Sequence, residues 1–147
     1  STRVRDALAA ADFDAAEQLL GRPFELAGRV LHGQKLGRQL DAPTANIALH
    51  RIRSPLHGVY AVNVWGGGLE CASGVANVGV KPTIGESLEA TLEVHVLTGS
   101  PDLYGERLTV RFRHKLRNEQ KFPSLDALKA GIAADKARAV AWLTEHG

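Results

Sequence analysis

Short runs of alternating apolar and polar residues, divided by glycine and proline, constrain the fold of this chain most strongly. They extend from Phe24 to His114. Alternation with period two predicts strands with one buried and one solvated face, as in an antiparallel sheet or barrel. We expect strands near residues 24–32, 44–49, 58–65, 69–78, 89–97 and 106–114. The run Gly66-Gly67-Gly68 is interpreted as a hairpin turn, because no phosphate-loop or dinucleotide fingerprint surrounds it.

Helical spacing of apolar residues is found at the two ends of the chain. Residues 4–20 show it first, and Asp14 with Glu17 offers a capping box between two short pieces that end at Gly21. Beyond Ser124 as N-cap, a second segment predicts an amphipathic helix against the sheet. Its expected apolar stripe is Leu125, Leu128, Ile132, Ala139, Val140 and Leu143. The fold class is therefore mainly β with flanking helices.

The composition of the chain limits the kinds of binding partner that we expect. A chain of 147 residues is long enough for one domain with a core, and a net charge of +2 gives little support to a nucleic-acid or membrane-surface partner. No apolar run approaches membrane-spanning length. The single cysteine, Cys71, is expected to be a buried small hydrophobe, and its lack of a disulfide partner weakly favours the cytoplasm. The absence of methionine suggests a piece of a longer protein.

A glycine-spaced basic loop runs into a rigid strand between residues 32 and 47. Pro43 favours an extended chain, so the side chains of Thr44 and Asn46 are expected on one face. Their hydroxyl and amide oxygens would suit Mg²⁺, which takes its remaining ligands from water and phosphates. Gly33 and Gly37 would let the backbone approach those phosphates closely, and Lys35 and Arg38 would supply positive charge. From the spacing alone, a simple polar loop entering a strand is about equally favoured.

Glu93 is the candidate base. Alternation over residues 91–96 places Leu92 and Val94 on the core face, and Glu93 on the other face with Thr91 and His95. A carboxylate held on a strand could accept the proton of a substrate hydroxyl. On the pattern alone, a solvated strand glutamate is the better interpretation.

The sequence resembles the riboflavin kinases, or flavokinases, whose signature contains His-Gly, Gly-Arg and Pro-Thr-Ala-Asn, as residues 32–47 do. Two departures bear on the nucleotide contacts: Lys35 replaces a usual glycine, and Asp41-Ala42 replaces Gly-Phe. Further matching strings follow in the family's order, and with them the resemblance covers about residues 24–143. These strings are Gly58-Val59-Tyr60-Ala61-Val62, Gly74-Val75-Ala76-Asn77-Val78-Gly79, Lys81-Pro82-Thr83, Glu93-Val94-His95, Asp102-Leu103-Tyr104-Gly105-Glu106 and Leu116-Arg117-Asn118-Glu119-Gln120-Lys121-Phe122.

The resemblance implies a six-stranded antiparallel Greek-key β-barrel with a long C-terminal helix. Its implied reaction is ATP-dependent phosphorylation of the riboflavin 5′-hydroxyl, assisted by Mg²⁺, to give FMN and ADP. Residues 24–147 would form this domain. Residues 1–23 would be a helical linker from an upstream FMN adenylyltransferase module, as in bacterial bifunctional FAD synthetases.

The resemblance also assigns roles residue by residue. Glu93 would be the general base, and Thr44 with Asn46 would hold the metal. A strand end and turn at residues 77–83 would help close the nucleotide side, and residues 84–88 could act as a flap. The ATP-binding set is Gly33, Lys35, Gly37, Arg38, Thr44, Asn46 and Asn77, and the flavin-binding set is Arg117, Phe122 and Leu125.

Two other classes of function stay open. A sensor that binds flavin or nucleotide without turnover would not need Thr44, Asn46 and Glu93 together. A barrel that binds single-stranded nucleic acid would use a basic groove and stacking aromatic residues. The alternation of Arg111, Arg113 and Lys115 predicts a basic strip on one strand face, which is the best argument for nucleic acid. The lack of an aromatic-rich strand face opposes that interpretation.

Overall fold

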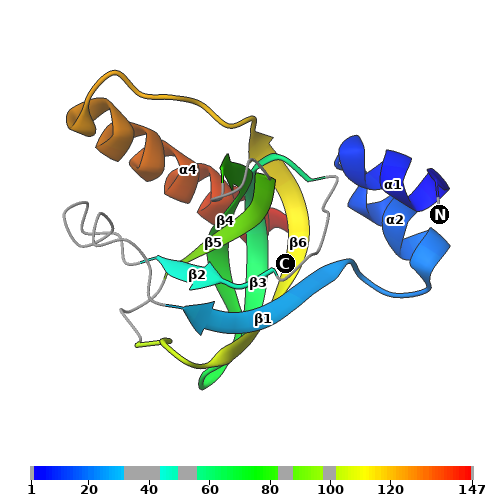
Figure 1. The fold of residues 1–147 in the computed structure, drawn as a ribbon. Helices are drawn as coiled ribbons and strands as arrows, with labels where there is room; N and C mark the ends of the chain where they lie inside the picture. Colours follow the sequence, from blue (N-terminus) through cyan, green and yellow to red (C-terminus); the bar gives the residue numbers. More distant parts are fainter. Residues whose placement is uncertain (1, 32–43, 50–55, 83–87, 98–101, 147) are drawn as a thin grey trace.

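The computed structural model describes residues 2–31, 44–49, 56–82, 88–97 and 102–146. Within these ranges the helices are α1 (Thr2–Ala9), α2 (Phe13–Leu20) and α4 (Leu125–His146). The strands are β1 (Glu25–Leu31), β2 (Ala45–Ile47), β3 (Gly58–Gly66), β4 (Leu69–Pro82), β5 (Leu88–Val96) and β6 (Arg107–Arg117). They close into an antiparallel barrel in the order β1-β2-β5-β4-β3-β6 (Figure 1). The predicted fold is confirmed.

The barrel is apolar inside and, under α4, apolar outside as well. On β5 the inward residues are Leu92 and Val94, as the alternation predicts. Strand β3 is buried on both faces, because Tyr60 lies in the barrel core whereas Val59 and Ala61 belong to a second cluster that packs against α4. A sheet covered on both faces gives a continuous apolar run rather than alternation.

Helix α4 is capped as predicted, and its buried residues lie on the predicted face. The backbone N–H of Ala127 donates to Ser124 Oγ at 3.1 Å, which satisfies one of the unpaired donors of the first turn. The residues it buries are Asp135, Ala139 and Leu143, spaced by four. Of the predicted stripe, Ala139 and Leu143 are buried and Leu128 and Ile132 are partly buried, whereas Leu125 and Val140 are 45% and 49% exposed.

The N-terminal helices pack onto the barrel. Asp12, rather than the predicted Asp14–Glu17 box, caps α2 by accepting from the backbone N–H of Ala15 at 3.0 Å. Phe13 lies in the same apolar cluster as the barrel interior, with its ring centroid 5.9 Å from that of Tyr60 and 6.2 Å from that of Phe112. Such aromatic contacts add to the burial of apolar area. Helix α2 therefore contributes to the core of the barrel. The proposed boundary between a linker and a domain at residue 24 stays a prediction.

The hairpin between β3 and β4 is confirmed. Gly66 pairs with Leu69, so Gly67 and Gly68 form a two-residue turn, both with positive φ, as a type I′ turn requires. Cys71, just beyond this turn, is exposed, so its predicted burial is wrong. Its φ of 51° departs from strand geometry, and the strand-like pattern gave no sign of this.

The predicted basic strip on β6 is wrong for Lys115, whereas Arg111 and Arg113 both lie on the side of Asn63. Two register shifts interrupt the pairing of β6 with β3, so Arg111 pairs with Asn63 and Lys115 pairs with Tyr60. Asn63 and Tyr60 are three residues apart on β3 and therefore point to opposite faces. Arg111 Nε is 2.8 Å from Glu25 Oε2, which neutralises its charge. Bulges of this kind cannot be foreseen from alternation.

Candidate active site

Three of the predicted site residues lie side by side on the outer surface of the barrel. Strand pairing sets Asn46 of β2 opposite Glu93 of β5, and Glu93 opposite Asn77 of β4. Directly opposed residues have Cβ atoms about 5 Å apart and project from the same face. We call Asn46, Glu93 and Asn77 the polar row. The sequence placed these residues on three separate strands, and the closed sheet brings them together.

The same register continues to the proposed flavin side. Asn77 is paired with Val59 of β3, and Val59 is paired with Arg117 at the end of β6. Val59 is 2% exposed and belongs to the cluster that packs against α4. The polar row therefore runs from β2 to the edge of α4. Arg117 lies in line with the row, separated from Asn77 by Val59.

Thr44 fits the same surface. It immediately precedes β2, and the register that pairs Asn46 with Glu93 continues to place Thr44 level with His95. Because Thr44 and Asn46 are two residues apart, their side chains share a face when the chain is extended. Among the described residues no three His, Cys, Asp or Glu side chains gather as a metal site. The neutral oxygens of Thr44 and Asn46 fit a metal ion whose charge is balanced by phosphates.

Arg117 is held by an ion pair with α4. Its Nε and Nη2 donate to Asp135 Oδ1 and Oδ2, both at 2.8 Å, and Nη1 donates to the carbonyl oxygen of Asn118 at 3.1 Å. The two side chains are only 21% and 7% exposed. The hydrogen bond with Asp135 raises the pKa of Arg117 further. A guanidinium has five N–H groups, so these three bonds leave donors for a ligand.

Phe122 packs between Arg117 and α4. The guanidinium carbon of Arg117 is 5.4 Å from the Phe122 ring centroid. Gly131 supplies the space on the helix, since a Cβ there would lie 2.5 Å from Phe122 Cζ. Glycine inside a helix costs about 1 kcal/mol relative to alanine, and the packed ring explains its presence. Leu125, the third predicted flavin residue, begins α4 and is 45% exposed.

Glu119 lies against β4 beside the polar row. A Cβ on Gly79 would be 2.6 Å from Glu119 Oε2, so only glycine lets the carboxylate approach the strand this closely. Gly79 and Asn77 are two residues apart and share a face. The structure corrects the predicted strand end here, because β4 continues through Gly79 to Pro82. The carboxylate of Glu119 is an acidic neighbour of the row that sequence reasoning gave no role.

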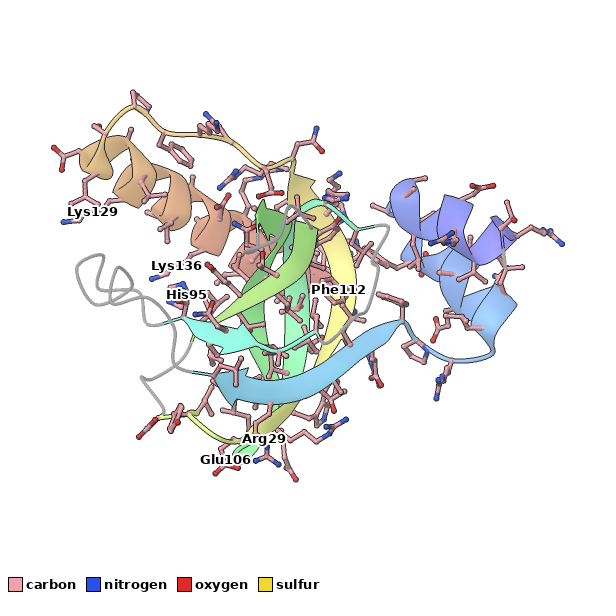
Figure 2. The ribbon with its side chains drawn as sticks, in the orientation of Figure 1. Arg29, His95, Glu106, Phe112, Lys129 and Lys136 are labelled. Carbon is pink, nitrogen blue, oxygen red and sulfur yellow. The ribbon has the colours of Figure 1, made fainter. Side chains whose placement is uncertain are left out.

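His95 is a buried neutral group next to Glu93. It is 8% exposed and pairs with Val75, which belongs to the cluster under α4. Burial, helped by the positive charge of Lys136, lowers the pKa of His95 to about 4. Figure 2 shows His95 and Lys136 close together between α4 and the β2–β5 side of the barrel. The imidazole is therefore uncharged at neutral pH.

We expect His95 to make the fold acid-sensitive. The unfolded chain has the ordinary histidine pKa near 6.5, so between pH 6.5 and 4 it binds more protons than the folded chain. The free energy of unfolding should then fall by roughly 3 kcal/mol as the pH falls through this window. Urea unfolding at several pH values measures the slope.

The matched comparison is His95→Gln against His57→Gln, since the His57 side chain is exposed. The first substitution should flatten the slope, and the second should leave it unchanged. The charged neighbours of His95 are Lys136 on α4 and Glu93 on the outer face of β5. Both remain in each variant. Equal slopes for His95→Gln and the unsubstituted chain would contradict the expectation.

Several predicted residues lie outside the described ranges. They are Gly33, Lys35, Gly37 and Arg38 of the basic loop, Thr83 of the turn, and residues 84–87 of the expected flap. Their roles stay predictions. Of the remaining site residues, the structure brings Asn46, Glu93 and Asn77 into one row, and it brings Arg117 and Phe122 into contact.

Sequence reasoning missed Asp135, Lys136 and the role of His95. A signal for Asp135 exists, because it precedes the buried Ala139 and Leu143 at a spacing of four. An acidic residue in line with an apolar stripe indicates a buried partner of opposite charge. Lys136 and His95 give no such signal, because their proximity depends on how α4 docks.

A cleft of about 500 Å³ lies elsewhere on the molecule, between α2, β6 and the end of α4. Its walls include Asp14, Glu17, Arg113 and Trp142, and it contains none of the predicted site residues. Arg113 in this cleft donates to the carbonyl oxygen of His146 at 3.1 Å, which caps the last turn of α4. We therefore interpret this cleft as the junction between the N-terminal helices and α4.

Comparisons with known proteins give matches over most of this chain. The family model described as flavokinase, riboflavin kinase, matches residues 20–143. A curated bifunctional riboflavin kinase/FMN adenylyltransferase from Pseudomonas fluorescens is 62% identical over 148 residues, which cover 99% of this chain and 47% of that protein. This chain thus spans about half the length of that relative.

Solved structures show the same fold. The riboflavin kinase from Trypanosoma brucei has a TM-score of 0.61 and 27% sequence identity, covering 83% of this chain and 80% of that one. A protein from Streptococcus pneumoniae described as a macrolide-efflux protein has a TM-score of 0.81 and 36% identity, covering 93% of this chain and 45% of that one. Within the described part of this chain, none of the helices has the length and apolar character to cross a membrane.

Proposed function

Because the chain belongs to the riboflavin kinase family, we propose that it transfers the γ-phosphoryl group of ATP to the 5′-hydroxyl of riboflavin, giving FMN and ADP. The observation that carries this proposal is the polar row. A carboxylate lies between two amides on the outer face of the barrel, and beyond them Arg117 at the end of β6 contacts the ring of Phe122 beside α4. Phosphoryl transfer needs mainly positioning and charge stabilisation, which such a wall can provide.

Glu93 would act as the general base. In the proposed step its carboxylate accepts the proton of the 5′-hydroxyl while that oxygen attacks the γ-phosphorus. The new O–P bond forms as the bond to the ADP oxygen breaks, and ADP leaves. Glu93 is exposed on the outer face of β5, so a substrate can reach it. A strand in a closed sheet holds the carboxylate more precisely than a loop would.

Thr44 and Asn46 are the proposed residues for Mg²⁺. Bound there, Mg²⁺ would neutralise negative charge on the phosphates of ATP. Asn46 is next to Glu93 in the row, so a metal-bound phosphate and the base would be neighbours. Asn77, on the other side of Glu93, is proposed to contact the nucleotide together with Gly33, Lys35, Gly37 and Arg38.

The flavin is proposed to bind at the edge of α4. An aromatic and an aliphatic side chain, Phe122 and Leu125, can flank an isoalloxazine ring, and Arg117 retains donors for its carbonyl groups. Arg117 is in line with the polar row but beyond Val59, and this separation suits a substrate whose ribityl chain extends from ring to base.

The deciding experiment is incubation of the purified chain with riboflavin, ATP and Mg²⁺, followed by chromatographic separation of riboflavin, FMN and FAD. We expect FMN without FAD, because this chain matches about half of its bifunctional relative and we propose that the adenylyltransferase activity belongs to a linked upstream module. Omission of Mg²⁺ should abolish the product. We also propose that the reaction takes place in the cytoplasm.

Riboflavin binding without FMN, under conditions in which ATP and Mg²⁺ are saturating, would contradict the kinase proposal and favour a sensor. Formation of FAD by this chain alone would contradict the division of the two activities. Unchanged turnover without Mg²⁺ would remove the metal role from Thr44 and Asn46.

A further inference from the structure

Lys136 places a positive charge beside the proposed reaction centre. It follows the buried Asp135 on α4 and is itself partly buried. It is close enough to the His95 imidazole to disfavour its protonation. His95 and Glu93 are two residues apart on β5 and share its outer face. The ammonium group therefore lies at the helix edge of the surface that carries the base.

This charge has no carboxylate partner in the described part of the chain. The ion pairs there join Arg111 to Glu25 and Arg117 to Asp135, and both carboxylate oxygens of Asp135 are taken by Arg117. His95 beside Lys136 carries no negative charge in either protonation state and cannot take the place of a carboxylate. A partly buried ammonium in this position is suited to an anion supplied by a ligand.

Lys129 differs from Lys136 in ways that make it a useful comparison. The two lysines are seven residues apart, which is about two helical turns, so they project from nearly the same side of α4. Lys129 is exposed and lies near the outer end of the helix, whereas Lys136 lies beside His95 (Figure 2). Of these two lysines, Lys136 is the one placed to meet an anion formed next to Glu93.

We propose that Lys136 binds the 5′-phosphate of the flavin product, so that the site distinguishes the phosphorylated flavin from riboflavin. This inference rests on the proposed function, because the phosphate is formed on the oxygen that Glu93 deprotonates. A lysine supplies a point charge that meets a phosphate without requiring fixed geometry. The proposal assigns to α4 a role in phosphate recognition in addition to its contact with the flavin ring.

The test is a comparison of two dissociation constants, for riboflavin and for FMN, measured by flavin fluorescence without nucleotide. In the unsubstituted chain FMN should bind more tightly. Lys136→Gln should weaken FMN binding by about tenfold and leave riboflavin binding within about twofold, because one charge-assisted contact is lost. Lys136→Arg should retain the preference for FMN, and Lys129→Gln should leave both constants unchanged.

Three results would overturn the proposal. One is equal weakening of riboflavin and FMN by Lys136→Gln, which would indicate a structural role. Another is the same loss in Lys129→Gln, which would indicate a general charge effect. The third is unchanged FMN binding in Lys136→Gln. Failure of the chain to make FMN would instead count against the proposed function, and the ratio of the two constants would still decide the role of Lys136.

Discussion

Glu93→Gln should lower the rate of FMN formation by about 10²–10⁴-fold, because a positioned general base typically contributes that factor. The amide keeps the size and polarity of the side chain but cannot accept the hydroxyl proton. Riboflavin affinity should change by less than about threefold, since the flavin contacts are proposed at Arg117, Phe122 and Leu125. Steady-state rates at saturating ATP and Mg²⁺, together with flavin titration, measure the two effects separately.

Glu70→Gln is the matched control for this substitution. Glu70 is an exposed strand glutamate on β4, close to the hairpin at Gly67 and Gly68, and lies away from the polar row. It should retain full turnover. Unchanged turnover in Glu93→Gln would remove Glu93 from the base role. Equal loss of turnover and of riboflavin affinity would instead indicate that Glu93 contributes to substrate binding.

Asp135→Ala should lower the free energy of unfolding by about 3 kcal/mol, because it leaves the largely buried guanidinium of Arg117 without its partner. Glu145→Gln, at an exposed position of the same helix, should stay within about 0.5 kcal/mol of the unsubstituted chain. Chemical unfolding measures both. A loss below about 1 kcal/mol for Asp135→Ala would mean that water solvates Arg117 well enough to replace the ion pair.

A double substitution separates the structural and binding roles of this ion pair. Arg117→Met combined with Asp135→Leu replaces the charges by apolar groups of similar size, which is often neutral or stabilising. Stability should therefore recover relative to Asp135→Ala. If Arg117 also binds flavin, riboflavin affinity should remain low in the double variant. Recovery of both properties would limit Arg117 to a structural role.

Local patterns predicted the strands well because alternation is a property of neighbouring residues. Leu92 and Val94 face inward and Glu93 faces outward for this reason. The polar row could not be predicted in this way. Its register joins positions 46, 77 and 93, and depends on how three strands pair in a closed sheet. Only the family resemblance connected these residues beforehand, and it gave their roles without their arrangement.

The stripe on α4 was predicted only in part. Sequence reasoning counted apolar residues, but the buried face of this helix includes a charged residue, Asp135, which Arg117 neutralises. Leu125 lies about five turns before Leu143 and so on the same side of the helix, but it begins α4 and is exposed; Val140 is turned by about 100° from Ala139 and is exposed as well. The bulges in β6 and the positive φ at Cys71 are likewise backbone features that hydrophobic periodicity does not encode.

The closed barrel fixes the spacing of the polar row, whereas helix α4 is free to vary in sequence. Asn46, Glu93 and Asn77 are spaced by main-chain hydrogen bonds of a sheet that has no free edge, so their separation cannot change without breaking the ladder. Helix α4 follows β6 in the chain and, within the described residues, packs on the barrel through the side chains of Ala139 and Leu143 and through the Arg117–Asp135 ion pair. Under the proposed roles, substitutions in the helix can therefore change flavin recognition without moving Asn46, Glu93 and Asn77.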